Sequence, residues 1–132
     1  MKDKKMIYSK FQTIELIAYG EYKEYEYAVI NYGTHPCCYV KLEQDDQFFG
    51  HEYANIPIAC HGGLTYSRKV LQLSSTEIDS DGWWIGWDYS HTGDYVPYLE
   101  AILDKEDVNR LKKWSTEELI GECKNVIDQL SE

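Results

Sequence analysis

The C-terminal segment 115–130 carries the most constraining pattern in the sequence. Ser115 can cap a helix, and Glu118 stands three residues later, where its carboxylate completes a capping box. The apolar residues that follow recur at the spacing of one helical face, which consists of Leu119, Ile120, Cys123, Val126, Ile127 and Leu130. Such a helix must bury this face, and the pattern predicts that it packs on a β-sheet.

The sheet is predicted from runs that alternate or are rich in apolar and aromatic residues. Residues 25–29 alternate with a period of two, residues 31–36 are turn formers, and residues 37–42 resume as an extended run. This order predicts a β-hairpin. Residues 58–67 and 82–89 are predicted to form further strands, the first of them interrupted by two glycines.

The N-terminal region has a different pattern. Within residues 10–19, apolar side chains at Phe11, Ile14, Ile17 and Ala18 lie near helical spacing, and Gly20 follows as a plausible stop. We therefore expect a short N-terminal helix. Together these elements predict an α+β fold, in which an antiparallel or mixed β-sheet is packed by the C-terminal helix and a short N-terminal helix. The length of 132 residues points to one domain spanning 1–132.

Charge and composition exclude several classes of function. The chain has 13 Lys and Arg against 23 Asp and Glu, a net charge of −10, which argues against broad binding to duplex nucleic acid. No apolar stretch is long enough to span a membrane, and no signal peptide is recognisable, so a cytoplasmic location is expected. The four cysteines lack CxxC spacing, so we expect reduced, mostly buried thiols, with no metal and no cofactor.

The segment 61–65, His-Gly-Gly-Leu-Thr, is the first candidate for chemistry. On an extended run, His61, Gly63 and Thr65 lie on one face. Consecutive glycines at Gly62 and Gly63 can turn backbone N–H groups toward an anion or let a ligand approach the main chain. The alternative is a glycine bulge with a hydrogen-bonded His and Thr, since no established phosphate-loop motif is present.

The segment 88–94 is the second candidate. Asp88, His91 and Asp94 are spaced three residues apart, a pattern that could bind a divalent metal or form an acid–base pair serving a ligand. The alternative is that both aspartates cap turns and that the histidine donates to backbone. His51 adds a further polar side chain in the same part of the sequence.

The tryptophan-rich strand is the third candidate. Trp83, Ile85 and Trp87 would share one face of a strand, and Trp84 would take the other. One face must be core, and the other could offer an aromatic floor for a base or sugar, where stacking is worth roughly 1–3 kcal/mol. The alternative is that all three indoles lie in the core or in a dimer interface.

These motifs, in this order and spacing, resemble a family of small phage and prophage proteins. The resemblance spans residues 25–130 and rests on Gly50-His51, 61–67, 83–88, His91, Gly93-Asp94, Glu122-Cys123 and Gln129-Leu130. Trp87 stands where the family pattern has Phe, and Ser90 stands where it has a small residue or cysteine; neither change removes a candidate polar group. The resemblance implies a phage setting, in which such proteins often act against host defence, but it implies no specific activity.

Three functions follow as hypotheses. The first is sequestration of a nucleotide-derived immune signal, such as a cyclic ADP-ribose relative or a cyclic dinucleotide. In this hypothesis the protein could also form a homo-oligomer. The ligand-binding residues would be His51, His61, Gly62, Gly63, Thr65, Trp84, Trp87, Asp88, His91 and Asp94. The second is a hydrolase or phosphodiesterase that uses His61, Asp88, His91 and Asp94. The third is an acidic inhibitor that binds a host defence protein.

Overall fold

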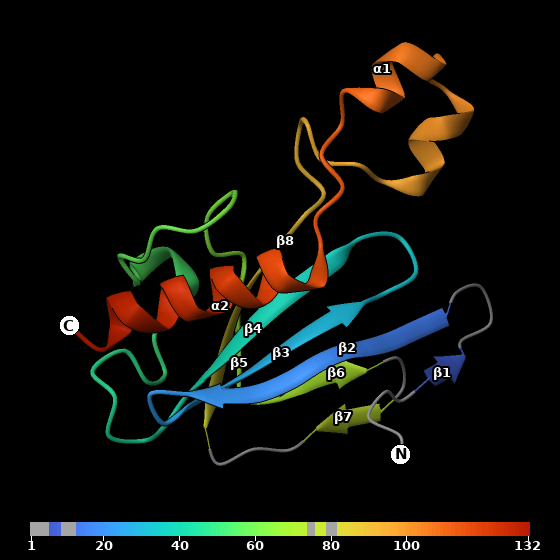
Figure 1. Cartoon of the computed structure of the whole chain (residues 1–132). Helices are drawn as coiled ribbons and strands as arrows, with labels where there is room; N and C mark the ends of the chain where they lie inside the picture. The colour runs from blue at the N-terminus through green and yellow to red at the C-terminus, as the bar shows by residue number, and fades with distance from the viewer. Residues whose placement is uncertain (1–5, 9–12, 74–75, 79–81) are drawn as a thin grey trace.

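The computed structural model describes residues 6–8, 13–73, 76–78 and 82–132, and it has the expected α+β architecture. A six-stranded sheet has the strand order β1-β2-β3-β4-β8-β5, and all of its neighbouring pairs are antiparallel (Figure 1). The strands are β1 (Met6–Tyr8), β2 (Thr13–Tyr22), β3 (Tyr25–Asn31), β4 (Pro36–Leu42), β5 (Tyr66–Arg68) and β8 (Trp83–Asp88). A separate hairpin pairs β6 (Leu71–Leu73) with β7 (Thr76–Ile78).

The C-terminal helix α2 (Thr116–Leu130) covers one face of the sheet, as its apolar face predicts (Figure 1). Ser115 Oγ accepts a hydrogen bond from the Glu118 backbone at 3.1 Å, and Glu118 Oε1 accepts one from the Ser115 backbone at 2.9 Å. This capping box confirms the predicted start of the helix. The buried helix residues pack against sheet residues in one core, which includes Val29, Cys38, Val40, Ile85, Trp87, Leu119, Cys123 and Val126.

A second, smaller core lies on the opposite face of the sheet. It contains Trp84, Tyr39 and Ile30, together with the fully buried Leu71 of β6. Because both faces of the central strands are covered, β3, β4 and β8 are buried along most of their length. The alternation predicted for the tryptophan strand is therefore confirmed, but each face meets a core.

The predicted N-terminal helix is wrong. The structure forms strand β2 from Thr13 onward, and residues 10–12 lie outside the described residues. The register between β2 and β3 shifts between Leu16 and Ala18. This bulge brings both Ile17 and Ala18 to the core under α2, so the strand loses its period of two and imitates helical spacing.

The predicted strand 58–67 is also shorter than expected. Only its last two residues belong to β5, and the preceding residues form a loop that follows the 3-10 helix η1 (Tyr53–Asn55). This loop is held on α2, where the Gln129 side chain makes two hydrogen bonds to the Ala59 backbone at 2.8 and 2.7 Å. Side-chain contacts with the helix therefore replace the ladder that the apolar pattern suggested.

Residues 97–111 extend away from the sheet and α2, and we call them the projecting unit (Figure 1). The unit contains the 3-10 helix η2 (Pro97–Ala101) and the short helix α1 (Lys105–Asn109). The segments that enter and leave the unit lie side by side where it joins the rest of the fold. There Lys112 forms a parallel β-bridge with Asp94, and its carbonyl accepts a hydrogen bond from the Tyr95 N–H. Among the described residues, no helix is long and apolar enough to cross a membrane.

Candidate functional site

Two glycine-containing turns form the centre of the candidate site. In residues 60–63, the Gly63 N–H donates to the Cys60 carbonyl at 3.0 Å, and Gly62 has a φ of +71°. In residues 91–94, the Asp94 N–H donates to the His91 carbonyl at 2.9 Å, and Gly93 has a φ of +95°. A positive φ at the third position of a turn favours glycine. The local backbone alone therefore accounts for these two glycines.

Asp94 joins the two turns. Its side chain is only 3% exposed. Oδ1 accepts a hydrogen bond from Trp114 Nε1 at 2.9 Å, and Oδ2 accepts one from the His91 backbone N–H at 2.9 Å. Oδ2 also lies 2.8 Å from His61 Nε2. One buried carboxylate thus connects both turns to the segment that leads into α2.

The ionisation of Asp94 follows from these contacts. Burial disfavours the charged carboxylate and is the largest single influence on its pKa. The hydrogen bonds from His61, the His91 backbone and Trp114 together outweigh that burial, so the pKa of Asp94 lies below its ordinary value. The carboxylate is therefore ionised at neutral pH.

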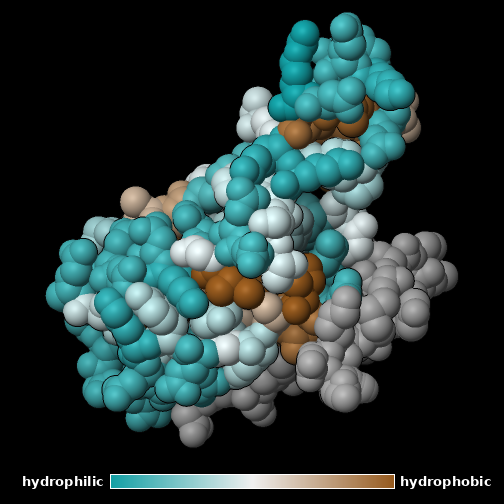
Figure 2. Space-filling view, viewed as in Figure 1, coloured by the Kyte–Doolittle hydropathy of each residue, from teal (hydrophilic) through white to brown (hydrophobic). Residues whose placement is uncertain are grey.

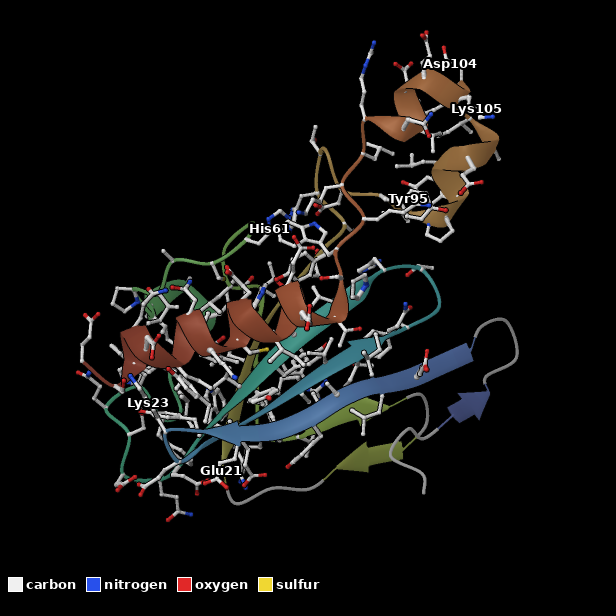
Figure 3. All side chains as sticks on the ribbon, in the orientation of Figure 1. Glu21, Lys23, His61, Tyr95, Asp104 and Lys105 are labelled. Carbon is white, nitrogen blue, oxygen red and sulfur yellow. The ribbon has the colours of Figure 1, made fainter. Side chains whose placement is uncertain are left out.

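His61 is fixed from several sides. Its ring stacks on Tyr89 with centroids 4.8 Å apart and an interplanar angle of 5°, and it meets Trp114 edge-on at 5.0 Å. Its backbone N–H donates to Glu122 Oε2 of α2 at 3.0 Å. Figure 3 shows His61 beside the N-terminal end of α2, close to the base of the projecting unit. The side chain is 24% exposed, so part of the imidazole still reaches solvent.

Asp88 and His91 form a second, looser pair. Asp88 Oδ1 accepts a hydrogen bond from the Ser90 N–H at 3.2 Å, which makes it a turn cap, and Thr65 Oγ1 lies 3.4 Å from Oδ2. His91 Nε2 is 3.2 Å from Asp88 Oδ1, but the geometry makes no hydrogen bond, and this buried nitrogen has no other partner among the described residues. The pair therefore gains charge attraction only when the imidazole is protonated.

Gly62 explains how the two pairs come so close. A Cβ at this position would lie 2.2 Å from His91 Nε2, whereas a Cβ at Gly63 would meet nothing within 4 Å. The His61 and His91 rings are consequently 5.5 Å apart. Six of the ten residues expected in the site are brought together here: His61, Gly62, Thr65, Asp88, His91 and Asp94. Gly63 belongs to the same turn as Gly62, but its Cβ position faces open space.

Three other expected site residues have different positions. Trp84 and Trp87 are each only 1% exposed, so neither indole offers an open stacking surface, which corrects the expectation of an aromatic floor. Trp87 contacts the site only through Tyr89, because its Nε1 donates at 3.0 Å to the Tyr89 hydroxyl and the Tyr89 ring stacks on His61. His51 contacts Phe48, and its carbonyl accepts from Trp83 Nε1 at 2.9 Å. Trp83 begins β8 and Asp88 ends it, roughly 16 Å away, so His51 is separate from the other histidines.

A cleft bordered by Tyr89 and Trp114 was not anticipated from the sequence. We call it the aromatic cleft; it encloses about 220 Å³ and is lined by residues that include Ile17, Asn31, Tyr89, Tyr95, Lys113 and Trp114. Lys113 Nζ lies 4.5 Å from the centre of the Tyr95 ring, and Lys112 Nζ lies 4.7 Å from that of Trp114. The walls of the aromatic cleft come from segments far apart in the chain. The one local signal for it in the sequence is the basic pair Lys112-Lys113 beside Trp114.

The other reactive groups nearby are less prepared for chemistry. Burial, followed by the charge of Glu122, raises the pKa of the Cys60 thiol to about 12, so the thiol is protonated at neutral pH. All four cysteines are free, and Cys37, Cys38 and Cys123 are buried. Within the described ranges, no three His, Cys, Asp or Glu side chains are grouped to hold a metal ion.

Comparisons with protein-family models, with curated proteins and with solved structures give no match to this chain. Two neighbouring regions of the structure therefore bear on function. One is the aromatic cleft, and the other is the Asp94 network, which consists of Asp94, His61, His91 and Trp114.

Proposed function

We propose that the protein binds and sequesters a small nucleotide-derived molecule in the aromatic cleft. The observation that carries the proposal is the charge of its lining. The chain has 23 acidic residues, yet none of the described residues that line the cleft is acidic, and Lys113 is the one charged side chain among them. Aromatic rings beside a cation suit a planar base joined to an anionic group.

The size of the cleft narrows the ligand class. Typical ligand pockets enclose about 300–1,000 Å³, and the aromatic cleft, at about 220 Å³, is smaller. One base with its ribose fits this space better than two nucleotides do. Asn31, Thr34 and Thr116 supply polar groups within the lining for ribose hydroxyls. A cyclic ADP-ribose relative has one base and a cyclic dinucleotide has two, so this favours the former, with its base and one ribose in the cleft and the rest of the molecule outside it. The phage resemblance would make that ligand a host immune signal.

The Asp94 network supports the cleft from behind. Trp114 lines the cleft and contacts His61, and Asp94 holds its indole. Tyr89, which is 1% exposed, supports this lining by packing against both His61 and Trp114. Under this proposal, the residues first expected to bind ligand instead position the aromatic wall. A rigid wall lowers the entropy that ordering would otherwise cost on binding.

Calorimetry tests the proposal with a panel of AMP, ADP-ribose, cyclic ADP-ribose and a cyclic dinucleotide. We expect binding of ligands that carry a single base, cyclic ADP-ribose among them, weakened at least tenfold in Lys113→Glu. Lys124→Glu is the matched control, because Lys124 also lies over a tyrosine ring, Tyr22, but outside the cleft lining. Absence of heat with every ligand at millimolar concentration, or equal losses in both variants, would contradict the proposal.

A second candidate is a hydrolase, favoured by the 2.8 Å contact between His61 Nε2 and the buried Asp94 carboxylate. An aspartate in this position can orient an imidazole as a general base. The two functions differ in the fate of the ligand. Ligand recovered intact after the protein is denatured by heat supports sequestration, whereas altered ligand, with turnover lost in His61→Gln, supports the hydrolase.

A further inference from the structure

The projecting unit, residues 97–111, lies apart from the rest of the fold. Helices η2 and α1 contact each other, while the sheet and α2 pack together at a distance from them (Figure 1). A helix of five residues such as α1 is not stable by itself in water. The unit therefore gains little of its stability from the main cores, and its sequence requires another explanation.

The unit also carries the most exposed apolar side chains. Ile102 is 68% exposed and Tyr98 is 63% exposed, the two highest values among the large hydrophobic residues that the structure describes. In Figure 2, hydrophobic atoms are grouped on the projecting unit and are bordered by hydrophilic ones. Exposed apolar groups with a polar rim are typical of protein interaction surfaces.

The projecting unit carries more negative than positive charge. It contains four carboxylates, Glu100, Asp104, Glu106 and Asp107, and two cations, Lys105 and Arg110. Arg110 is already paired with Asp107 at 3.1 Å. Figure 3 shows Asp104 and Lys105 at the far end of the unit, away from the cleft. The unit that carries Tyr98 and Ile102 therefore has an excess of two negative charges.

We propose that the projecting unit is a docking surface for a protein partner that has an apolar groove rimmed by Lys and Arg. Charge complementarity favours such a partner over a second copy of this chain, because two molecules of net charge −10 repel each other. Tyr98 and Ile102 would enter the groove, and the carboxylates would face its basic rim. This inference is independent of the proposed ligand, since neither Tyr98 nor Ile102 lines the aromatic cleft.

The test uses the full chain and a double variant, Tyr98→Ser with Ile102→Ser. Tyr53→Ser is the matched control, because Tyr53 is another exposed aromatic, at 41%, and lies outside the unit. Immobilised protein captures partners from bacterial lysate, mass spectrometry identifies them, and each candidate is purified for calorimetry. Circular dichroism establishes that all variants are folded.

We expect one purified partner with a basic surface, whose affinity falls at least tenfold in the double variant, remains unchanged in Tyr53→Ser and weakens as salt is raised. Three results would overturn the proposal. They are the absence of any specific partner, a partner that binds the double variant as tightly as the native chain, and self-association in ultracentrifugation that the double variant abolishes.

Discussion

Two aspartates, Asp94 and Asp128, each connect separate elements of this protein, and their surroundings differ sharply. Asp94 is almost fully buried, and its carboxylate accepts hydrogen bonds from the Trp114 indole and the His91 backbone and contacts His61 Nε2. Asp128 of α2 lies 2.7 Å from Lys23 Nζ and accepts from the Tyr22 hydroxyl at 3.0 Å, but its side chain remains 46% exposed. Water can replace the partners of Asp128, whereas loss of Asp94 leaves buried donors without acceptors. Burial therefore decides which contact holds the fold.

The largest expected effect comes from Asp94→Ala. The substitution leaves Trp114 Nε1 and the His91 N–H without their acceptor, so we expect a loss of about 2–4 kcal/mol in the free energy of unfolding. Asp128→Ala is the comparison, with a much smaller shift. Urea denaturation of both variants measures the difference. Equal losses would show that burial does not distinguish the two aspartates.

Gly62→Ala should be the next most damaging change, at about 2 kcal/mol. A left-handed backbone costs about 1–2 kcal/mol with a side chain, and the new methyl would also press on the His91 ring. Gly63 has a similar φ of +83° in open space, so Gly63→Ala should cost only the backbone part. A thermal melt in which the two variants coincide would remove the role of the His91 contact.

At the β2–β3 hairpin, near Asp128, introducing a glycine should raise the stability of the protein, whereas replacing Gly62 or Gly63 should lower it. The hairpin between β2 and β3 turns at Lys23 and Glu24, which have φ values of +50° and +69° without being glycine. We expect Glu24→Gly to stabilise the protein by about 0.5–1 kcal/mol, because it relieves backbone strain. Glu21→Gly removes the same charge from a strand position and should destabilise it. Loss of stability in both variants would argue against strain at this turn.

The smallest expected effect is on how the free energy of unfolding depends on pH in acid. Because the folded pKa of Asp94 lies below its unfolded value of about 3.9, the ionised carboxylate stabilises the fold above that value. This contribution is lost as the pH falls through the folded pKa. Denaturation between about pH 5 and pH 2 should therefore show a steeper loss for the native chain than for Asp94→Asn. Parallel curves would contradict the assigned environment.

The elements with a local pattern could be predicted from the sequence, and those shaped by distant contacts could not. The capping box at Ser115 and the alternation in β3 are properties of neighbouring residues, and both predictions are confirmed. The helix expected at 10–19 is wrong because a bulge, defined only by pairing with β3, disturbs the strand period. The strand expected at 58–67 is mostly loop because Gln129 of α2 binds the Ala59 backbone.

The candidate site divides in the same way. Spacing placed Asp88, His91 and Asp94 around one turn, and the structure brings His61 to them. Trp114 and Glu122 complete this network from more distant parts of the chain, and Tyr89 joins it from within the 88–94 segment, where only polar residues were considered.

The sequence by itself determined the helix face, the hairpin and the excess of negative charge, because each depends on composition or on residues close together in the chain. Only the tertiary structure decided that Trp84 and Trp87 are buried and that Asp94 is the buried carboxylate. It also decided that a cleft with no acidic side chain among its described lining residues forms beside Trp114. Burial and local charge depend on which distant segments meet, and no spacing along the chain specifies that.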